Sequence, residues 1–203
     1  MKHSLFFCIF KDNIKKFFAI CFVFYLSLFV QNGFAEKHFD ETKEYSSITI
    51  IDAGQKFFGK TTEGLSDTIE KIFSRYGAPK AYILGEQASG AAILGATYGE
   101  GHIYFKNNLE QKIYWQGPSL GWDFGASGTR VMMLVYNIDT IDQIWNQRFT
   151  GPSGSFYAVV GLGVNVLFHD KLILIPIQTG IGARVALNIN YLKFTPTATW
   201  NPF

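Results

Sequence analysis

Cysteine is nearly absent from this chain of 203 residues. The two cysteines, Cys8 and Cys21, both lie within the first 35 residues, which have the pattern of a removable leader. The rest of the chain therefore offers no disulfide, no thiolate metal ligand and no cysteine nucleophile. Beyond the leader, histidine occurs only as His38, His102 and His169, which lack the close spacing of metal ligands. We expect neither a metal nor another cofactor.

A strong charge of either sign is also missing once the leader is set aside. Residues 1–35 hold four of the 18 Lys and Arg residues and one of the 16 Asp and Glu residues. The remainder has 14 basic and 15 acidic residues, a net charge of −1. A near-neutral chain lacks the basic surface that nucleic acid requires, so we expect no nucleic-acid partner.

Motifs of nucleophilic catalysis and nucleotide binding are missing as well. Neither Ser119 nor Ser127 lies in a GxSxG elbow. The glycines of residues 161–166 lack the third glycine and the Lys-Ser/Thr pair of phosphate-binding loops. The sequence therefore favours a protein that is not an enzyme.

Carboxylates that act in pairs in a glycosidase cannot be recognised from their positions in the sequence. Glu86 with Glu100, or Asp123 with Asp142, could serve a glycosidase, but neither pair differs in sequence from solvated surface.

The first feature that the sequence does contain is an N-terminal leader. Four early lysines precede an apolar run over residues 17–30, and the small residues Gly33 and Ala35 follow. This pattern predicts a secretory signal peptide that is cleaved between Ala35 and Glu36. The run of about 14 residues is shorter than the roughly 20 that a spanning helix needs, although a retained inner-membrane anchor is an alternative.

After the leader we expect a flexible acidic tether over residues 36–53 and a single domain over residues 54–203. Residues 62–76 have the marks of a helix, with Thr62 as its N-cap and Gly77 as its stop. The apolar residues of this helix fall on one face, which predicts that the face packs against a core. They are Leu65, Ile69, Ile72, Phe73 and Tyr76. Binding of this helix to a membrane surface is the alternative. A membrane-surface helix needs a cationic polar face, however, and the basic and acidic residues of this helix balance.

From Lys80 onward the hydrophobic period becomes that of strands. We expect a hairpin turn at residues 106–112 and one short helix after Asp139 or Thr140 that buries Ile144 and Trp145. The expected fold is mainly β: a small soluble antiparallel β-barrel with one capping amphipathic helix and one short helix. The expected strands are residues 80–87, 90–99, 102–107, 111–116, 129–137, 155–168, 171–178 and 183–194.

Residues 117–130, "GPSLGWDFGASGTR", are expected to be a glycine-rich connection between two strands. Trp122 and Asp123 stand out, because an indole beside an acid either packs over a sheet edge or contacts a partner. Arg130 follows the connection and is a further candidate for binding.

A second candidate site combines polar residues on neighbouring strand faces. Asn165 shares a face with Gly161 and Gly163, and Arg184, Asn188 and Asn190 share another small, polar face. These residues could line a shallow polar groove, or the small residues could simply permit tight curvature of a barrel.

Several motifs in order resemble one known family. "GPSLGWD", "TRVMMLVYN", "GLGVN", "PIQTGIGARVALNINYL" and the terminal "NPF" are similar to the periplasmic envelope integrity protein EipA family, over about residues 54–203. The resemblance implies an exported, soluble β-barrel of the Gram-negative periplasm that supports envelope integrity and stress resistance. It also implies a distant likeness to SYLF domains, some of which bind lipids. It implies no catalytic residues.

Three functions remain open from the sequence. The first is a non-enzymatic periplasmic protein, expected to be a monomer, that contacts an envelope lipid, glycan or protein. The second is a lipid carrier with an acyl chain inside the barrel, which needs a cavity of a few hundred cubic ångströms. The third is an envelope hydrolase that uses Asp123 with a histidine. Four large residues favour a filled barrel over a carrier: Met133, Trp145, Phe156 and Leu187.

Overall fold

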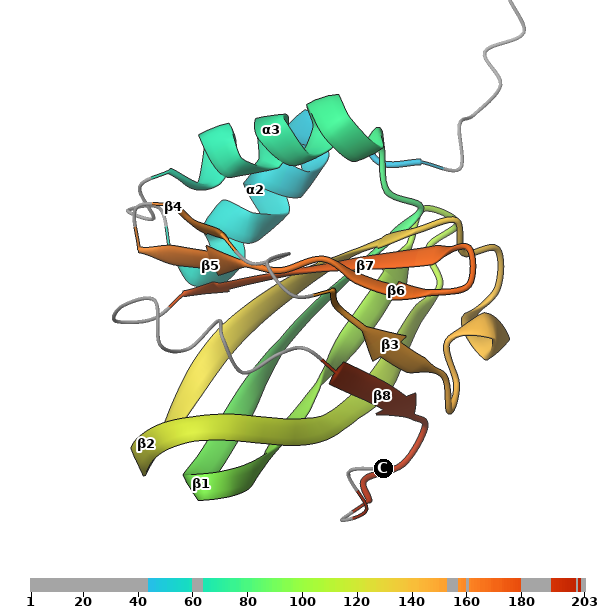
Figure 1. Ribbon diagram of the computed structural model, residues 1–203. Coiled ribbons are helices and arrows are strands. Elements are labelled where there is room, and N and C mark those ends of the chain that lie inside the picture. The colour runs from blue at the N-terminus through green and yellow to red at the C-terminus, as the bar shows by residue number, and fades with distance from the viewer. Residues whose placement is uncertain are drawn as a thin grey trace, which may run out of the picture. The chain divides into compact units, whose positions relative to one another are not determined.

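The computed structural model describes residues 44–59, 64–152, 157–159, 161–179, 191–199 and 201, without the side chains of 89–95, 119–128 and 157–159. Within these residues the fold is mainly β, as expected, and Figure 1 shows its arrangement. The helices are α2 (Ser47–Phe58), α3 (Leu65–Tyr76) and the short 3-10 helix η2 (Ile141–Gln143). The strands are β1 (Ala81–Phe105), β2 (Glu110–Tyr136), β3 (Arg148–Thr150), β4 (Tyr157–Val159), β5 (Leu162–Val164), β6 (Leu167–His169), β7 (Leu172–Thr179) and β8 (Tyr191–Thr195).

The strands form one antiparallel sheet that closes on itself. Their order is β1-β2-β8-β3-β6-β7-β5-β4, and β2 also pairs with β7. The start of β2, at Tyr114–Gln116, pairs with β8, and its end, at Val131–Tyr136, pairs with β7. β2 therefore joins both ends of the circuit through β8, β3, β6 and β7, which makes a barrel and confirms that prediction.

A long hairpin of β1 and β2 dominates the barrel. Its turn lies at residues 106–109, as predicted, where the Phe105 N–H donates to the Leu109 carbonyl at 2.9 Å and Asn108 has a φ of 63°. Both strands bend strongly at the lower end of the barrel in Figure 1. The three strands expected between residues 80 and 107 are therefore one bent strand.

The expected connection at residues 117–130 was wrong, because these residues are the middle of β2. Ala92 of β1 lies opposite Trp122, and Ala91 lies opposite Asp123, just past a register shift after Ser89. Cross-strand pairing satisfies the backbone groups here. Glycine within a paired strand permits strong bending, so the glycines mark a curve and not a loop.

Glycines also let the two halves of β1 meet. A Cβ added at Gly85 would lie 2.7 Å from the Gly101 Cα and would overlap the Glu100 carbonyl oxygen. A Cβ at Gly101 would overlap the Leu84 carbonyl oxygen. The backbones at Gly85 and Gly101 are therefore in direct contact, a proximity that any larger residue would prevent.

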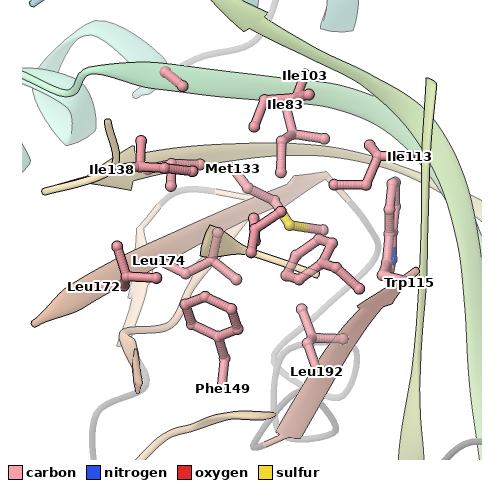
Figure 2. Close-up of a cluster of buried hydrophobic side chains, with 14 of the residues drawn as sticks. Ile83, Ile103, Ile113, Trp115, Met133, Ile138, Phe149, Leu172, Leu174 and Leu192 are labelled. Carbon is pink, nitrogen blue, oxygen red and sulfur yellow. The ribbon is translucent and has the colours of Figure 1, made fainter. Parts of the chain in front are cut away.

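Side chains fill the described interior of the barrel. Alternate residues of β2, including Val131, Met133 and Val135, belong to one buried cluster with residues from β1, β3, β6, β7 and β8. Figure 2 shows its members converging from opposite walls, with Trp115 at one side and Leu172 at the other. Met133 is buried and Trp145 packs against the cluster as expected, while Phe156 and Leu187 lie outside the described residues.

The other face of the same strands carries α2 and α3. Met132 and Leu134 alternate with the interior residues of β2 and belong to a second buried cluster with residues of both helices. Figure 1 shows the two helices beside each other over this part of the sheet. The predicted apolar face of α3 is confirmed, because Leu65, Ile69 and Ile72 are buried in that cluster. Burial of each such side chain contributes about 1.5–3 kcal/mol.

The ends of α3 agree only partly with the sequence. Its C-terminal stop at Gly77 is confirmed by a φ of 77° and by an N–H that donates to the Phe73 carbonyl at 2.9 Å. The residue at the N-cap is Gly64, and the expected cap, Thr62, lies outside the described residues.

Helix α2 was not expected. The predicted tether over residues 36–53 was wrong from Ser47 onward, because the helix begins there. The Ser46 hydroxyl caps it by accepting a hydrogen bond from the Thr49 N–H at 3.2 Å. Ile50 is fully buried, and a Cβ at Gly54 would lie 3.0 Å from a Leu65 methyl group. Packing against α3 thus stabilises a short segment that weak local signals alone do not predict.

The helix and strands that follow β2 are shorter than expected. The predicted short helix is the single turn η2, followed by the fully buried Ile144. The strand predicted over residues 155–168 is divided into β4, β5 and β6, with Gly161 turning at a φ of 78°. In the part of the chain that the structure describes, no helix is long and apolar enough to cross a membrane.

Candidate functional site

Two of the residues expected to bind a partner have hydrogen bonds within the fold, and their role in binding stays a prediction. The Arg130 Nη1 donates to the Phe57 carbonyl at 3.0 Å, which ties the end of α2 to β2. Asn165 is 2% exposed, and its Oδ1 accepts a hydrogen bond from the Val166 N–H at 2.8 Å. Both side chains therefore have structural partners.

The side chains of the other expected site residues lie outside the described part of the structure. The structure gives the backbone of Trp122 and Asp123 within β2 but not their side chains. Arg184, Asn188 and Asn190 lie outside the described residues, as do Ala35 and Glu36 of the cleavage site. The polar groove and the hydrolase pairing of Asp123 with a histidine stay predictions.

A pocket of about 390 Å³ lies beside the contact between the two halves of β1. Residues 86–88 follow Gly85, residues 98–100 precede Gly101, and both segments line it. The neighbouring stretch of β2 and the segment after β8 supply the remaining walls. The full described lining is Glu86, Gln87, Ala88, Tyr98, Gly99, Glu100, Tyr114, Trp115, Gln116, Ala198 and Thr199.

Trp115 forms a buried wall of the pocket. Its indole lies directly on Gly99, because a Cβ there would be 2.5 Å from the Trp115 Cζ2 atom. The indole N–H donates to the Gln87 Oε1 at 3.3 Å, and the Gln87 Nε2 donates to the Gln178 Oε1 at 3.2 Å. All three side chains are at most 4% exposed. A buried chain of amides therefore fixes the orientation of the tryptophan.

Gln116 is the least satisfied side chain of the pocket. It is 1% exposed, and within the described residues its Nε2 has no hydrogen-bond partner. Its Oε1 lies 3.4 Å from the Thr195 hydroxyl, which also donates to the Thr197 carbonyl at 2.8 Å. A buried amide group without a partner costs about 1–3 kcal/mol.

The rim of the pocket is aromatic and charged. Glu100 forms an ion pair with Lys112 at 3.2 Å, and Glu86 forms one with Arg130 at 3.7 Å. The Lys112 Nζ also lies 5.2 Å from the centre of the Tyr114 ring. The hydrogen bond to Glu100 raises the pKa of Lys112, with a further contribution from Tyr114. The acidic side chains are 68% exposed for Glu86 and 60% for Glu100.

The two described histidines lie elsewhere. His169 Nδ1 is 3.2 Å from the Arg148 carbonyl, and His102 packs near Tyr104 with 6.4 Å between ring centres. Neither is among the pocket residues, and the described part of the chain contains no cluster of His, Cys, Asp or Glu that could hold a metal.

Sequence reasoning missed this pocket for an identifiable reason. Its residues come from four distant segments that only the bent hairpin brings together. One signal was present: Gln87 continues the inward alternation of Ala81, Ile83 and Gly85, where an apolar residue is expected. A polar residue at a core position often marks a functional site.

Comparison with known proteins places the chain in context. The family described as EipA, envelope integrity protein A, matches residues 43–203. A crystal structure of a β-barrel-like, uncharacterized protein from Brucella abortus shares 51% sequence identity and a TM-score of 0.72, over 80% of this chain and 100% of that chain. No curated protein matches the chain significantly. The resemblance of the sequence to the envelope integrity protein A family is confirmed.

Proposed function

Because the chain belongs to the envelope integrity protein A family, we propose that it supports the cell envelope as an exported periplasmic binding protein without catalytic activity. The lysine-rich, apolar leader of residues 1–35 supports export and cleavage after Ala35. The family name supports the role in envelope integrity. The pocket supports a mode of action in which the protein binds an envelope component.

The observation that carries the proposal is the pocket itself. Its volume of about 390 Å³ falls within the range of about 300–1,000 Å³ that is usual for ligand sites. It combines the aromatic residues Tyr98, Tyr114 and Trp115 with the buried amide of Gln116. Aromatic walls with a few polar groups are typical of sites that bind small molecules or parts of larger ones.

The environment of the carboxylates supports binding over hydrolysis. Glu86 and Glu100, a pair with no distinguishing signal in the sequence, both line the pocket. Each is more than half exposed and paired with a cation. A glycosidase instead keeps its acid in apolar surroundings and its second carboxylate at a defined distance across the substrate.

The filled interior argues against a carrier that encloses an acyl chain within the barrel. Trp115, Phe149 and Phe194 are at most 1% exposed, and Phe149 and Phe194 pack edge to face at 5.6 Å. An acyl chain would have to displace side chains from this cluster, which is packed as a protein core.

A genetic test separates the envelope role from catalysis. A Gram-negative strain that lacks this gene is challenged with detergent, and plasmids supply the wild type or the variants Glu86→Gln and Glu100→Gln. We expect the strain to be sensitive, and all three proteins to restore resistance at equal protein levels. A resistant deletion strain would contradict the envelope role. Glutamine keeps an oxygen that accepts hydrogen bonds from a ligand, so failure of a folded, exported variant would contradict the non-enzymatic mode if the purified wild type also cleaved envelope glycan and that variant did not.

A further inference from the structure

The unpaired amide of Gln116 limits the kind of ligand that the pocket can take. The Thr195 hydroxyl has one proton, which its 2.8 Å bond to the Thr197 carbonyl uses. Rotating the Gln116 amide by half a turn would let Nε2 donate to Thr195, but Oε1 would then lack a partner. Among the described residues, at least one amide atom is therefore left over in either orientation, and a hydroxyl group suits both orientations because it donates and accepts.

An acyl chain would leave this amide unpaired, so it would not remove the cost of burying it. A hydroxylated ligand would provide the missing partner and would bind more tightly for that reason. The described pocket therefore favours a ligand whose oxygen atoms can form hydrogen bonds with the Gln116 amide.

The aromatic residues require a ligand that is not polar on all sides. Tyr98 and Tyr114 line the pocket and are half-buried. The rings of tyrosine offer an apolar face and a polar hydroxyl. A sugar ring matches this pattern, because its C–H groups form an apolar face and its hydroxyls surround the edge.

Charge argues against anionic ligands. Within the described lining, the charged residues are Glu86 and Glu100. The nearby cations, Lys112 and Arg130, are already bound to these carboxylates. A phosphate or a lipid A headgroup would meet two acidic side chains, whereas neutral hydroxyls can donate hydrogen bonds to them.

We propose that this pocket binds a neutral saccharide unit, with Gln116 pairing with one of its oxygens and the tyrosines contacting its ring. That the saccharide belongs to an envelope glycan rests on the proposed function, but the binding chemistry does not. Gln87 is a positioning residue, because its amide holds Trp115 in place.

The test uses the full chain, expressed with its leader and purified from a Gram-negative host. Titration calorimetry and saturation-transfer NMR measure binding of glucose, N-acetylglucosamine and the disaccharide of N-acetylglucosamine. Gln116→Leu removes the amide at similar size, and Gln111→Leu is the matched control on the same strand outside the pocket lining. Because Gln116→Leu removes an unpaired buried group, its thermal stability should equal or exceed that of the wild type.

We expect at least one saccharide to bind, and Gln116→Leu to weaken its binding by about tenfold or more while Gln111→Leu leaves it unchanged. Tyr98→Ala should also weaken it. Absence of binding at millimolar saccharide would overturn the proposal, as would equal affinity of the wild type and Gln116→Leu. Binding of phosphatidylglycerol vesicles that is insensitive to Gln116→Leu would indicate a lipid surface instead and would also overturn it. If saccharides do not bind but the deletion strain is still sensitive, only this inference fails and the envelope role stands.

Discussion

At the scale of single residues, three glycines determine the shape of the site. Gly85 and Gly101 allow the halves of β1 to touch, and Gly99 gives space to the indole of Trp115. The pocket begins directly beyond this contact. A methyl group at any of these positions would meet backbone or a fixed ring. The shape of the pocket therefore depends on glycine at all three positions.

Gly99→Ala tests this dependence. The new Cβ would overlap the Trp115 indole, which is held by Gln87 and cannot move freely. We expect the free energy of unfolding, measured by urea denaturation, to fall by about 1–3 kcal/mol, as for other overpacked cores. Ala88→Val on the same strand is the control, because Ala88 is exposed and its change should have little effect. Equal stability of the two variants would show that Trp115 is not confined by Gly99.

Tyr45 predicts an alkaline limit to stability. Burial, with a smaller effect of Tyr82, raises the pKa of Tyr45 to about 12, above the usual value of about 10. Its ring packs edge to face on Tyr82 at 5.0 Å. A phenol whose pKa is higher in the folded state favours folding while it is protonated. Its contribution is therefore complete below about pH 10 and is lost as the pH rises through about 12.

Unfolding free energies measured between pH 9 and pH 11, as approximate limits, check this expectation. The wild type should lose stability as the pH rises above about 10. Tyr45→Phe should lose less, because phenylalanine has no proton to release. Tyr82 and Tyr104 also have raised pKa values, so part of the loss should persist in the variant. An identical pH dependence in both proteins would show that Tyr45 does not contribute.

At the scale of elements, α2 and α3 act as a cover for the outer face of β2 and β7. Their buried residues share one cluster with Met132, Leu134, Ile175 and Ile177. β2 is thus apolar on both faces over residues 131–136, with its odd residues inside the barrel and its even residues under the helices. Removing the cover would expose the even face to water.

Ile69→Ala measures how much α3 contributes to this cover. Ile69 is fully buried, so its truncation should lower the free energy of unfolding by about 2–5 kcal/mol. Lys71→Ala, on the exposed side of the same helix, should change it by less than about 0.5 kcal/mol. A small effect of Ile69→Ala in urea denaturation would mean that the barrel is stable without α3.

The elements also show what the sequence could predict. The face of α3 and its stop at Gly77 follow from local periodicity and glycine chemistry, and both are confirmed. Two features depend on distant contacts instead. Residues 117–130 have the composition of a turn, and only their pairing with β1 makes them a strand. Gln116 lies opposite Lys193 and beside Thr195 of β8, which is about 75 positions away in the chain, so no local pattern could reveal its burial.

At the scale of the whole molecule, the fold combines a filled barrel with a pocket outside its core. The interior is packed with aliphatic and aromatic residues, as Figure 2 shows, and their burial stabilises the fold. The pocket lies where the bent β1–β2 hairpin meets the segment after β8. The central claim is that this pocket, and not the barrel interior, carries the function in the envelope.

The most direct measurement is complementation of the deletion strain by Gln116→Leu, with detergent resistance as the readout and Gln111→Leu as the control. Both variants should be exported and folded at wild-type levels. We predict that Gln111→Leu restores resistance and that Gln116→Leu does not. Full resistance with Gln116→Leu would contradict the claim that the pocket carries the function.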